Sequence, residues 1–275
     1  MMRRISTFLL AILIASLALS PRRLSKFMTV AVVVLLSVSA FATIAYANHS
    51  WGGYHWARTS NPFNLKLGDN VSTVWDGHLI DASTDWSKST VLDTTIIAGA
   101  NKKNCGPING RVEVCNKTYG RNGWLGVASI WISGTHIVQG TVKLNDTYFN
   151  TATYNTPAWR QFVMCQEVGH TFGLDHQDVS FGNPNLGTCM DYTSDPSTNQ
   201  HPNTHDYAQL ESIYTHLDSV TTVGQTVSQP RGNGNAAEAD EAGKVLREDS
   251  KGHSALYERD LDEGEKLFTF IFWAE

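Results

Sequence analysis

Hydrophobic and polar residues follow each other along this chain in two periods, which predict a mixture of helices and strands. Apolar residues at helical spacing predict helices over Val74–Ser89, over a segment that starts at Thr156-Pro157, and over Asn203–Leu217. Runs rich in β-branched and aromatic residues between turn residues predict strands, of which Trp124–Ser133 is the longest. The other predicted strands are Tyr54–Arg58, Phe63–Leu67, Thr94–Ala98, Gly140–Leu144 and Leu267–Trp273. The pattern favours an α+β fold, with helices packed on a sheet.

The amino-terminal segment has the pattern of an export signal. Basic residues precede two apolar runs, Phe8–Leu19 and Val30 to Ala45, and the second run ends in Ala45-Tyr46-Ala47. This order predicts a signal peptide over 1–47, cleaved before Asn48, and a secreted, extracellular protein. The alternative is an uncleaved membrane anchor, because the second run nearly reaches the length that spans a bilayer.

Composition divides the remaining chain into three parts. Residues 48–218 carry the periodic patterns and form one predicted domain. Residues 219–253 are rich in Gly, Ala, Ser, Glu and Asp without periodicity, which predicts a flexible acidic linker. Residues 254–275 form a β-rich segment to which the sequence assigns no role.

Charge and size limit the partners of the protein. The 275-residue chain is 41% hydrophobic, and its net charge of −5 becomes −10 when the five basic residues of 1–47 are removed. An acidic protein is a poor ligand for nucleic acid or for an anionic membrane. We therefore expect a monomer that meets a membrane only if the leader is uncleaved.

One short stretch carries the chemistry. On a helix, Gln166 and His170 project from one face, and Glu167 flanks the same patch. Gly173 suits the end of the helix, where a positive φ is easiest for glycine, and the turn can bring His176 back towards the helix. Imidazoles beside a carboxylate that takes a proton from metal-bound water are typical of a zinc protease.

This stretch resembles the metzincin signature, H-E-x-x-H-x-x-G-x-x-H, and is most similar to the matrixin-like branch. Every position matches except the first, where Gln166 replaces the first histidine. Met190 follows at the place of the methionine turn, and Tyr192 matches a tyrosine that leans towards the metal in some branches. A buried helix with two hydrogen-bonded histidines is the simpler alternative, but it explains neither Gly173 nor the methionine turn.

The resemblance implies a fold and an activity. The fold would be a metzincin-type catalytic domain over 48–218, with a twisted mixed sheet, an active-site helix, a methionine turn and a carboxy-terminal helix. The activity would be that of a zinc metalloendopeptidase on peptide or protein substrates, with Zn²⁺ bound by His170, His176 and Gln166. Glu167 would be the general base towards zinc-bound water, and Tyr192 would stabilise the oxyanion.

In the same family, a strand at the sheet edge binds the peptide substrate as an additional strand. Leu125–Ile130 is the best match here, which makes Leu125, Gly126, Val127 and Ala128 the predicted substrate-binding residues. An ordinary core strand is the alternative interpretation.

Gln166 opens a second functional hypothesis. An amide oxygen binds zinc more weakly than an imidazole does, so zinc affinity would fall, although the site would keep an open position and the same charge. If zinc is lost, the protein would be a non-catalytic peptide- or matrix-binding module on the same fold.

Four cysteines in an exported protein predict two disulfides, for which three pairings are possible. Cys105 and Cys115 bracket a short Gly/Pro/Asn loop, while Cys165 opens the metal helix and Cys189 adjoins the methionine turn. We favour these two pairs over a thiolate ligand at Cys165. No second metal is predicted, because His136 stands alone and His201, His205 and His216 have the character of surface or core residues.

Overall fold

The computed structural model describes residues 49–100, 103–225, 243–261 and 264–274. The predicted leader, its cleavage point before Asn48, and residues 226–242 of the predicted linker lie outside these residues. Residues from Ala47 to Glu275 form one structural unit. No helix within the described ranges has both the length and the apolar character needed to cross a bilayer.

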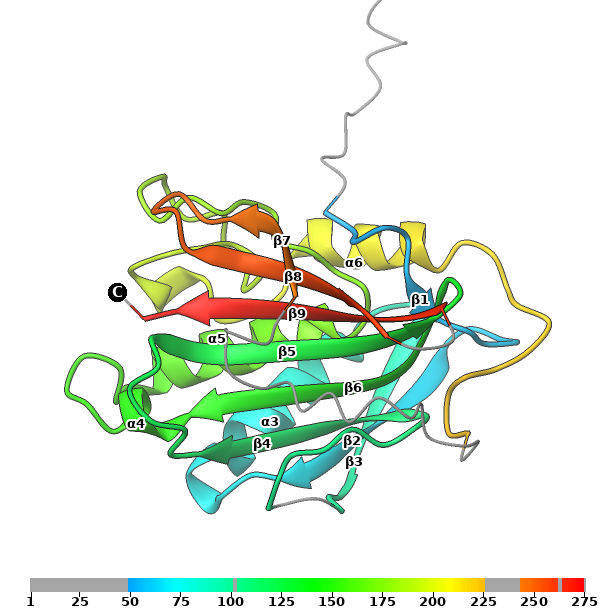
Figure 1. The fold of residues 1–275 in the computed structure, drawn as a ribbon, viewed down its shortest axis with the longest axis horizontal. Coiled ribbons are helices and arrows are strands. Elements are labelled where there is room, and N and C mark those ends of the chain that lie inside the picture. The colour runs from blue at the N-terminus through cyan, green and yellow to red at the C-terminus, as the bar shows by residue number, and fades with distance from the viewer. Residues whose placement is uncertain (1–48, 101–102, 226–242, 262–263, 275) are drawn as a thin grey trace, which may run out of the picture. The chain divides into compact units, whose positions relative to one another are not determined.

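A mixed nine-stranded sheet forms the centre of this unit (Figure 1). Its main strand order is β3-β2-β4-β6-β5-β9-β8-β7, and the short β1 pairs with β6 off this path. Strands β2, β3, β4 and β6 are parallel, whereas β5, β9, β8 and β7 continue the sheet with antiparallel pairs. The strands are β1 His55–Trp56, β2 Phe63–Asn70, β3 Leu92–Ala98, β4 Arg111–Lys117, β5 Trp124–Ser133, β6 His136–Asn145, β7 Lys244–Glu248, β8 Ser254–Asp260 and β9 Glu265–Trp273.

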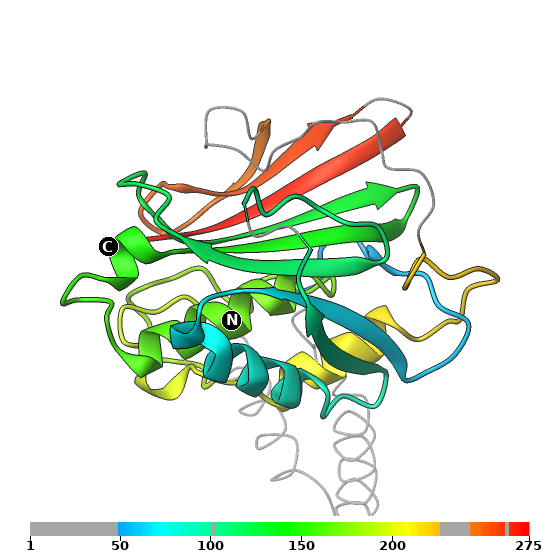
Figure 2. The same ribbon diagram turned by 90° about the horizontal axis from the view of Figure 1, so that it is seen from below.

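The three longer helices lie on one face of the sheet, as Figure 2 shows. They are α3 Thr73–Trp86, α5 Pro157–His170 and α6 Thr204–Ile213; α4 Asp146–Phe149 and the 3₁₀ turn η1 Pro196–Thr198 are short. The predicted α+β class, with a mixed sheet, a helix carrying the motif and a final helix, is thus confirmed.

Helix starts agree with the sequence because their caps are local. The Thr156 hydroxyl accepts a hydrogen bond from the amide of Trp159 (3.2 Å) just before Pro157 begins α5. Asn203 caps α6, and Asp206 completes a reciprocal capping box. The predicted end at Leu217 is too late, since α6 ends at Ile213.

Both favoured disulfides are present, and no cysteine is free. Cys105–Cys115 closes the loop before β4, and Cys165–Cys189 joins α5 to the turn that contains Met190. Because Cys165 is bonded to Cys189, it offers no thiolate to a metal.

The carboxy-terminal strands change the expected architecture. β7 lies inside the predicted flexible linker, and β9 pairs with β5 along nearly its whole length. β5 is therefore an interior strand, and its expected role as a free edge for a substrate is corrected for this structure. The physical reason is that β9 satisfies the backbone groups of β5 while burying the aromatic residues Phe268, Phe270 and Phe272.

Candidate active site

The last turns of α5 and the bend after it assemble the predicted motif. Gly173 has φ +95°, and a Cβ there would lie 2.3 Å from the carbonyl oxygen of Tyr54, so glycine is required for both reasons. Beyond this bend the chain returns, and Nε2 of His176 lies 2.9 Å from Nε2 of His170. We call Gln166, Glu167, His170 and His176 the inner site.

The two imidazoles of the inner site are in the form that binds metals. Nδ1 of His170 lies 2.9 Å from the carbonyl oxygen of Leu174 and donates to it, so the neutral ring turns its Nε2 lone pair towards His176, with which it shares a hydrogen bond. Burial lowers the pKa of His170 to about 4, despite the opposing Leu174 carbonyl. Burial, followed by the neighbouring His170, lowers the pKa of His176 well below its ordinary value. Both rings are thus neutral near pH 7.

Gln166 is fully buried and held by one end of its amide. Its Nε2 donates to the carbonyl oxygens of Cys189 (2.9 Å) and Asp191 (3.3 Å), on either side of Met190. Its Oε1 has no hydrogen-bond partner within the described residues. The hydrogen bonds therefore leave the carbonyl oxygen, the atom expected to bind zinc, as the unused end of the side chain.

Glu167 is a buried carboxyl group without ordinary partners. Neither carboxylate oxygen has a hydrogen-bond partner in the part of the chain that the structure describes. A Cβ at Gly126 would lie 2.4 Å from Oε1 of Glu167, so glycine in β5 makes the room for this side chain. Burial raises the pKa of Glu167 well above its ordinary value, and the backbone of Ala128, whose approach falls short of hydrogen-bond geometry, opposes this rise only in part.

Met190 and Tyr192 lie where the motif predicts. Met190 is fully buried beneath the end of α5, since a Cβ at Gly169 would lie 2.7 Å from its sulfur. The ring centroid of Tyr192 lies 4.4 Å from that of His176. Burial raises the pKa of Tyr192 well above its ordinary value, so the hydroxyl is a neutral donor, and it donates to the carbonyl oxygen of Ile271 in β9 (3.2 Å).

The residues of the inner site fit a zinc ion. Zinc accepts neutral imidazole nitrogen and amide or carboxylate oxygen as ligands. Two imidazole nitrogens that face each other, a buried amide oxygen without a partner and an adjacent unpaired carboxyl group are a set that is costly to bury for packing alone. His170, His176 and Gln166 are the residues that would hold the metal.

Strand β9 covers the inner site. Its register on β5 pairs Phe272 with Gly126 and Phe270 with Ala128. The ring of Phe270 stacks flat on the imidazole of His170, with centroids 4.3 Å apart and an angle of 8°. The predicted substrate-binding residues Leu125, Gly126, Val127 and Ala128 are all buried as a result.

An ion pair joins β7, which belongs to the same group of carboxy-terminal strands as β9, to the loop of the inner site. Arg247 of β7 forms a two-pronged pair with the carboxylate of Asp175, which lies between Leu174 and His176 in the chain. The same carboxylate accepts a hydrogen bond from the amide of His176 (2.8 Å). Asp175 is only 4% exposed, so the pair is mostly desolvated on its acidic side.

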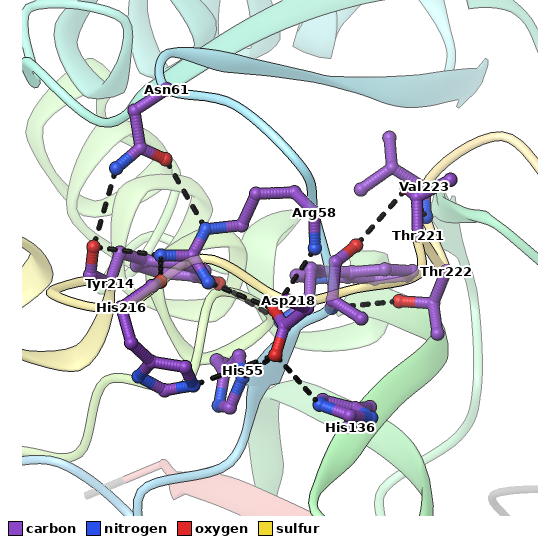
Figure 3. Close-up of polar contacts among 12 residues, drawn as sticks. His55, Arg58, Asn61, His136, Tyr214, His216, Asp218, Thr221, Thr222 and Val223 are labelled. Atoms are coloured by element: carbon purple, nitrogen blue, oxygen red, sulfur yellow. Dashed lines mark hydrogen bonds and ion pairs between the residues drawn. The ribbon is translucent and has the colours of Figure 1, made fainter.

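A second histidine group was not recognised in the sequence. His55, His136 and His216 surround Asp218, whose other oxygen binds Arg58 (Figure 3). We call His55, His136, His216 and Asp218 the outer cluster. His55 and His136 are direct partners in the β1–β6 ladder, a non-local pairing that no local sequence pattern predicts. The one local signal for this cluster is the spacing of His216 and Asp218, two residues apart in the chain.

Two groups among the described residues have ligand atoms within 4.8 Å of one another, as a metal would require. One is His55, His216 and Asp218 of the outer cluster, and the other is His49, His205 and Asp206. In the second group, Oδ2 of Asp206 accepts from Thr188 and the Asn203 amide (2.7 Å), and Oδ1, the oxygen that faces His49, already accepts from the Gln177 side-chain amide (2.9 Å). The outer cluster is therefore the better candidate of the two.

Comparisons with known proteins give structural matches only. No protein family model and no curated sequence matches this chain. One similar solved structure is high choriolytic enzyme 1, a hatching enzyme zinc-protease from Oryzias latipes (medaka fish), at 10% identity and a TM-score of 0.34, covering 60% of this chain and 96% of that one. Another is myroilysin, at 9% identity and a TM-score of 0.32, covering 63% and 97%. Neither TM-score reaches 0.5, so neither similarity assigns this chain to a family or an activity.

Proposed function

We propose that this protein is a secreted, metzincin-type, matrixin-like zinc metalloendopeptidase with glutamine in place of one histidine ligand. The observation that carries the proposal is the set of unsatisfied polar atoms in the inner site, Oε1 of Gln166 and both oxygens of Glu167, beside two facing imidazoles. Buried polar atoms without partners cost stability, so their presence together favours a site built for a ligand.

When bound, zinc would supply a Lewis acid that polarises the scissile carbonyl and acidifies water. Glu167 would accept a proton from the attacking water and deliver it to the leaving amine. Its carboxyl group would have to ionise first, which hydration of an uncovered cleft favours. The Tyr192 hydroxyl, a neutral donor beside His176, would donate a hydrogen bond to the oxyanion once it is released from Ile271.

A second candidate function is a non-catalytic peptide-binding module. The observation that favours it is β9 itself, because a strand already lies on β5 above the inner site and Gln166 is tied to backbone carbonyls. Such a module would bind an extended peptide without cleaving it.

One experiment separates these functions. Wild type, Glu167→Ala and Gln166→His are purified without leader, dialysed against zinc, and compared for metal content and for hydrolysis of an unfolded protein. The same three proteins are also made with Arg247→Ala, which weakens the attachment of the carboxy-terminal strands. This second set distinguishes a site that β9 blocks from a site that has no activity. We expect turnover that a chelator abolishes, zinc without turnover in Glu167→Ala, and tighter zinc in Gln166→His.

Two outcomes would decide against a natural protease. Wild type that holds no zinc at the inner site and does not cleave in either background, beside a Gln166→His variant that gains both, would identify a pseudo-protease. Zinc binding without turnover in every variant would leave the peptide-binding module.

Secretion is tested separately. The leader pattern motivates cleavage before Asn48. Amino-terminal sequencing of protein from the medium should begin at Asn48, whereas intact Met1 in a membrane fraction would support the anchor.

A further inference from the structure

We infer that β9 occupies the cleft as an intramolecular peptide, and that the cleft accepts extended, antiparallel peptides with aromatic side chains at alternate positions. This inference rests on the proposed function of the inner site. It adds the class of peptide that the cleft binds and the strand that blocks the cleft.

The backbone arrangement is that of a peptide added to a sheet. Residues Glu265–Trp273 run antiparallel to β5, with Phe272 opposite Gly126, Ile271 opposite Val127 and Phe270 opposite Ala128. Figure 1 shows β9 directly beside β5, followed by β8 and β7. Strand addition uses main-chain hydrogen bonds for affinity and alternate side chains for specificity.

The alternate side chains of β9 separate into two faces. Phe268, Phe270 and Phe272 join the main core on the helix side, whereas Ile271 packs on the other face with Trp124, Val127 and Tyr257. Only the first set lies on the side of the inner site, where Phe270 contacts His170 directly. A peptide in the place of β9 would therefore be selected at these three positions.

Each of the three phenylalanines meets its own aromatic surroundings. Phe270 stacks on His170. Phe272 contacts Phe162, Phe181 and Tyr192, with centroids 5.2, 5.9 and 5.0 Å away. Phe268 contacts Trp51 and Tyr54, at 5.3 and 5.1 Å. Aromatic pairs at these separations favour an aromatic occupant over an aliphatic one.

The ion pair of Arg247 with Asp175 is the contact whose loss would release the carboxy-terminal strands from the inner site. It is an ion pair between β7 and the loop of the inner site, and the Arg247 side chain is 29% exposed. A partner that competes for Arg247, or a peptide that replaces β9, would uncover the inner site.

The test uses the full mature chain in four forms: wild type, Arg247→Ala, the control Lys244→Ala on the same strand, and a lock made of Val127→Cys with Ile271→Cys. The lock joins paired residues on the face away from the inner site. The probes are a labelled peptide with the sequence of Glu265–Trp273 and the same peptide with its three phenylalanines replaced by alanine. Binding is read by fluorescence polarisation.

We expect Arg247→Ala to bind the aromatic peptide at least about tenfold more tightly than wild type, because a larger fraction of molecules is open. Lys244→Ala should match wild type, the alanine peptide should bind far more weakly to every form, and the oxidised lock should bind only after reduction. Equal binding of both peptides, or binding to the oxidised lock as to wild type, would overturn the inference.

The two proposals fail in different ways. Peptide binding that is blocked by the lock, with no hydrolysis of any peptide, keeps this inference and removes the protease. Hydrolysis of peptides without aromatic residues by the oxidised lock keeps the protease and removes this inference. If Arg247→Ala does not fold, the lock and its reduction still decide.

We also propose, from independent residues, that the outer cluster binds a structural zinc ion through His55, His216 and Asp218, whose ligand atoms lie within 4.8 Å of one another. Oδ1 of Asp218 lies 3.5 Å from Nε2 of His55 and 3.5 Å from Nε2 of His216. Ligand atoms at the corners of a tetrahedron around zinc lie about 3.3 Å apart, given bonds of about 2.0–2.1 Å. The two 3.5 Å distances are at the long end for hydrogen bonds and suit an ion between the atoms, whereas His136 makes a 3.2 Å hydrogen bond to the same oxygen.

The orientation of His55 also suits a metal ligand. Nδ1 of His55 lies 2.9 Å from the carbonyl oxygen of Gly53 and donates to it, so Nε2 is the nitrogen that faces the Asp218 carboxylate. Fixing one ring nitrogen on a backbone carbonyl is a common way to orient a metal-binding histidine.

Arg58 holds the carboxylate in position. Its backbone amide (3.1 Å) and its Nη1 (3.0 Å) both donate to Oδ2 of Asp218, which leaves Oδ1 for the histidines. Figure 3 shows Arg58 on one side of Asp218 and the three imidazoles on the other.

Metal content tests this site on the full mature chain. We compare zinc per chain, and the absorption of the cobalt-loaded protein, in wild type, His216→Ala, His136→Ala, His170→Ala and the control His201→Ala. His216 and His201 are matched, since their side chains are 59% and 60% exposed. We expect one equivalent of metal to disappear in His216→Ala and to remain in His136→Ala, His201→Ala and His170→Ala. Metal content unchanged by His216→Ala would show a protonated histidine cluster without metal and overturn the proposal.

Discussion

The inner site and the outer cluster use the same chemical groups in opposite surroundings. The inner site draws its ligands from one helix and the bend after it, is covered by β9, and keeps its histidines neutral by burial. The outer cluster gathers residues from β1, the start of β6 and the segment after α6, around one carboxylate that Arg58 also binds. Its His216 side chain is largely exposed.

This difference separates two ways of holding a proposed metal site in place. At the inner site, aromatic packing and the Cys165–Cys189 disulfide fix the ligands, so substitutions there should change stability even without metal. At the outer cluster, charge and hydrogen bonds fix the ligands, so an exposed histidine should matter only when metal is present.

Phe270→Ala should lower the free energy of unfolding by about 3–5 kcal/mol, because it removes a fully buried ring and leaves a cavity above His170. Ile271→Ala, on the other face of β9, should cost about 2–4 kcal/mol but leave the inner site covered. Urea unfolding gives both costs, and accessibility of His170 to a histidine-modifying reagent should rise only in Phe270→Ala. Equal reactivity of the two variants would contradict the role of Phe270 as a cover.

Removing the Cys165–Cys189 disulfide should cost about 3.5 kcal/mol, and removing Cys105–Cys115 about 2.7 kcal/mol, on chain-entropy grounds. The order follows from sequence separations of 24 and 10 residues. Paired alanine variants are compared by urea unfolding. Only loss of the first bond should also weaken zinc at the inner site, since Cys189 adjoins Met190 and its carbonyl holds Gln166. Equal zinc affinity in both variants would show that the Cys165–Cys189 disulfide does not support zinc binding at the inner site.

Local features of the sequence were predicted well, and the reason is that they need no distant partner. The cap at Thr156, the bend at Gly173 and the motif on α5 depend on residues within about three turns of helix. The structure brings His170 and His176 together at the end of the helix and places Met190 beneath it. The α+β class followed from the same periodicities.

Features that depend on strand pairing could not be predicted. The alternation of Phe268, Phe270 and Phe272 identified a strand, but nothing local showed that it would pair with β5 and close its edge. The partnership of His55 with His136 arises from the β1–β6 ladder across 81 positions in the chain. Non-local pairing is chosen by the packing of the whole sheet, which a single sequence does not display.

Gln166→Leu should cost about 2 kcal/mol of stability without metal, because two carbonyls in the methionine turn, those of Cys189 and Asp191, lose their shared donor. In the presence of zinc it should also lose the metal of the inner site and leave that of the outer cluster. Gln166→His, which restores a nitrogen ligand, is the control. Retention of both metals in Gln166→Leu would show that the amide oxygen is not a ligand.

His216→Ala should change stability by less than about 0.5 kcal/mol in a chelator, because the side chain is exposed and Arg58 still pairs with Asp218. Added zinc should then separate the proteins. A ligand at one hundred times its dissociation constant stabilises the state that binds it by about 2.7 kcal/mol, so wild type and His201→Ala should melt at a higher temperature than His216→Ala. Thermal melts with and without zinc give the comparison, and the zinc of the inner site contributes equally to all three. A zinc-induced shift in His216→Ala as large as in wild type would mean that the outer cluster holds its shape through Arg58 and Asp218 alone, and that the contrast between the two histidine groups lies in packing and not in metal.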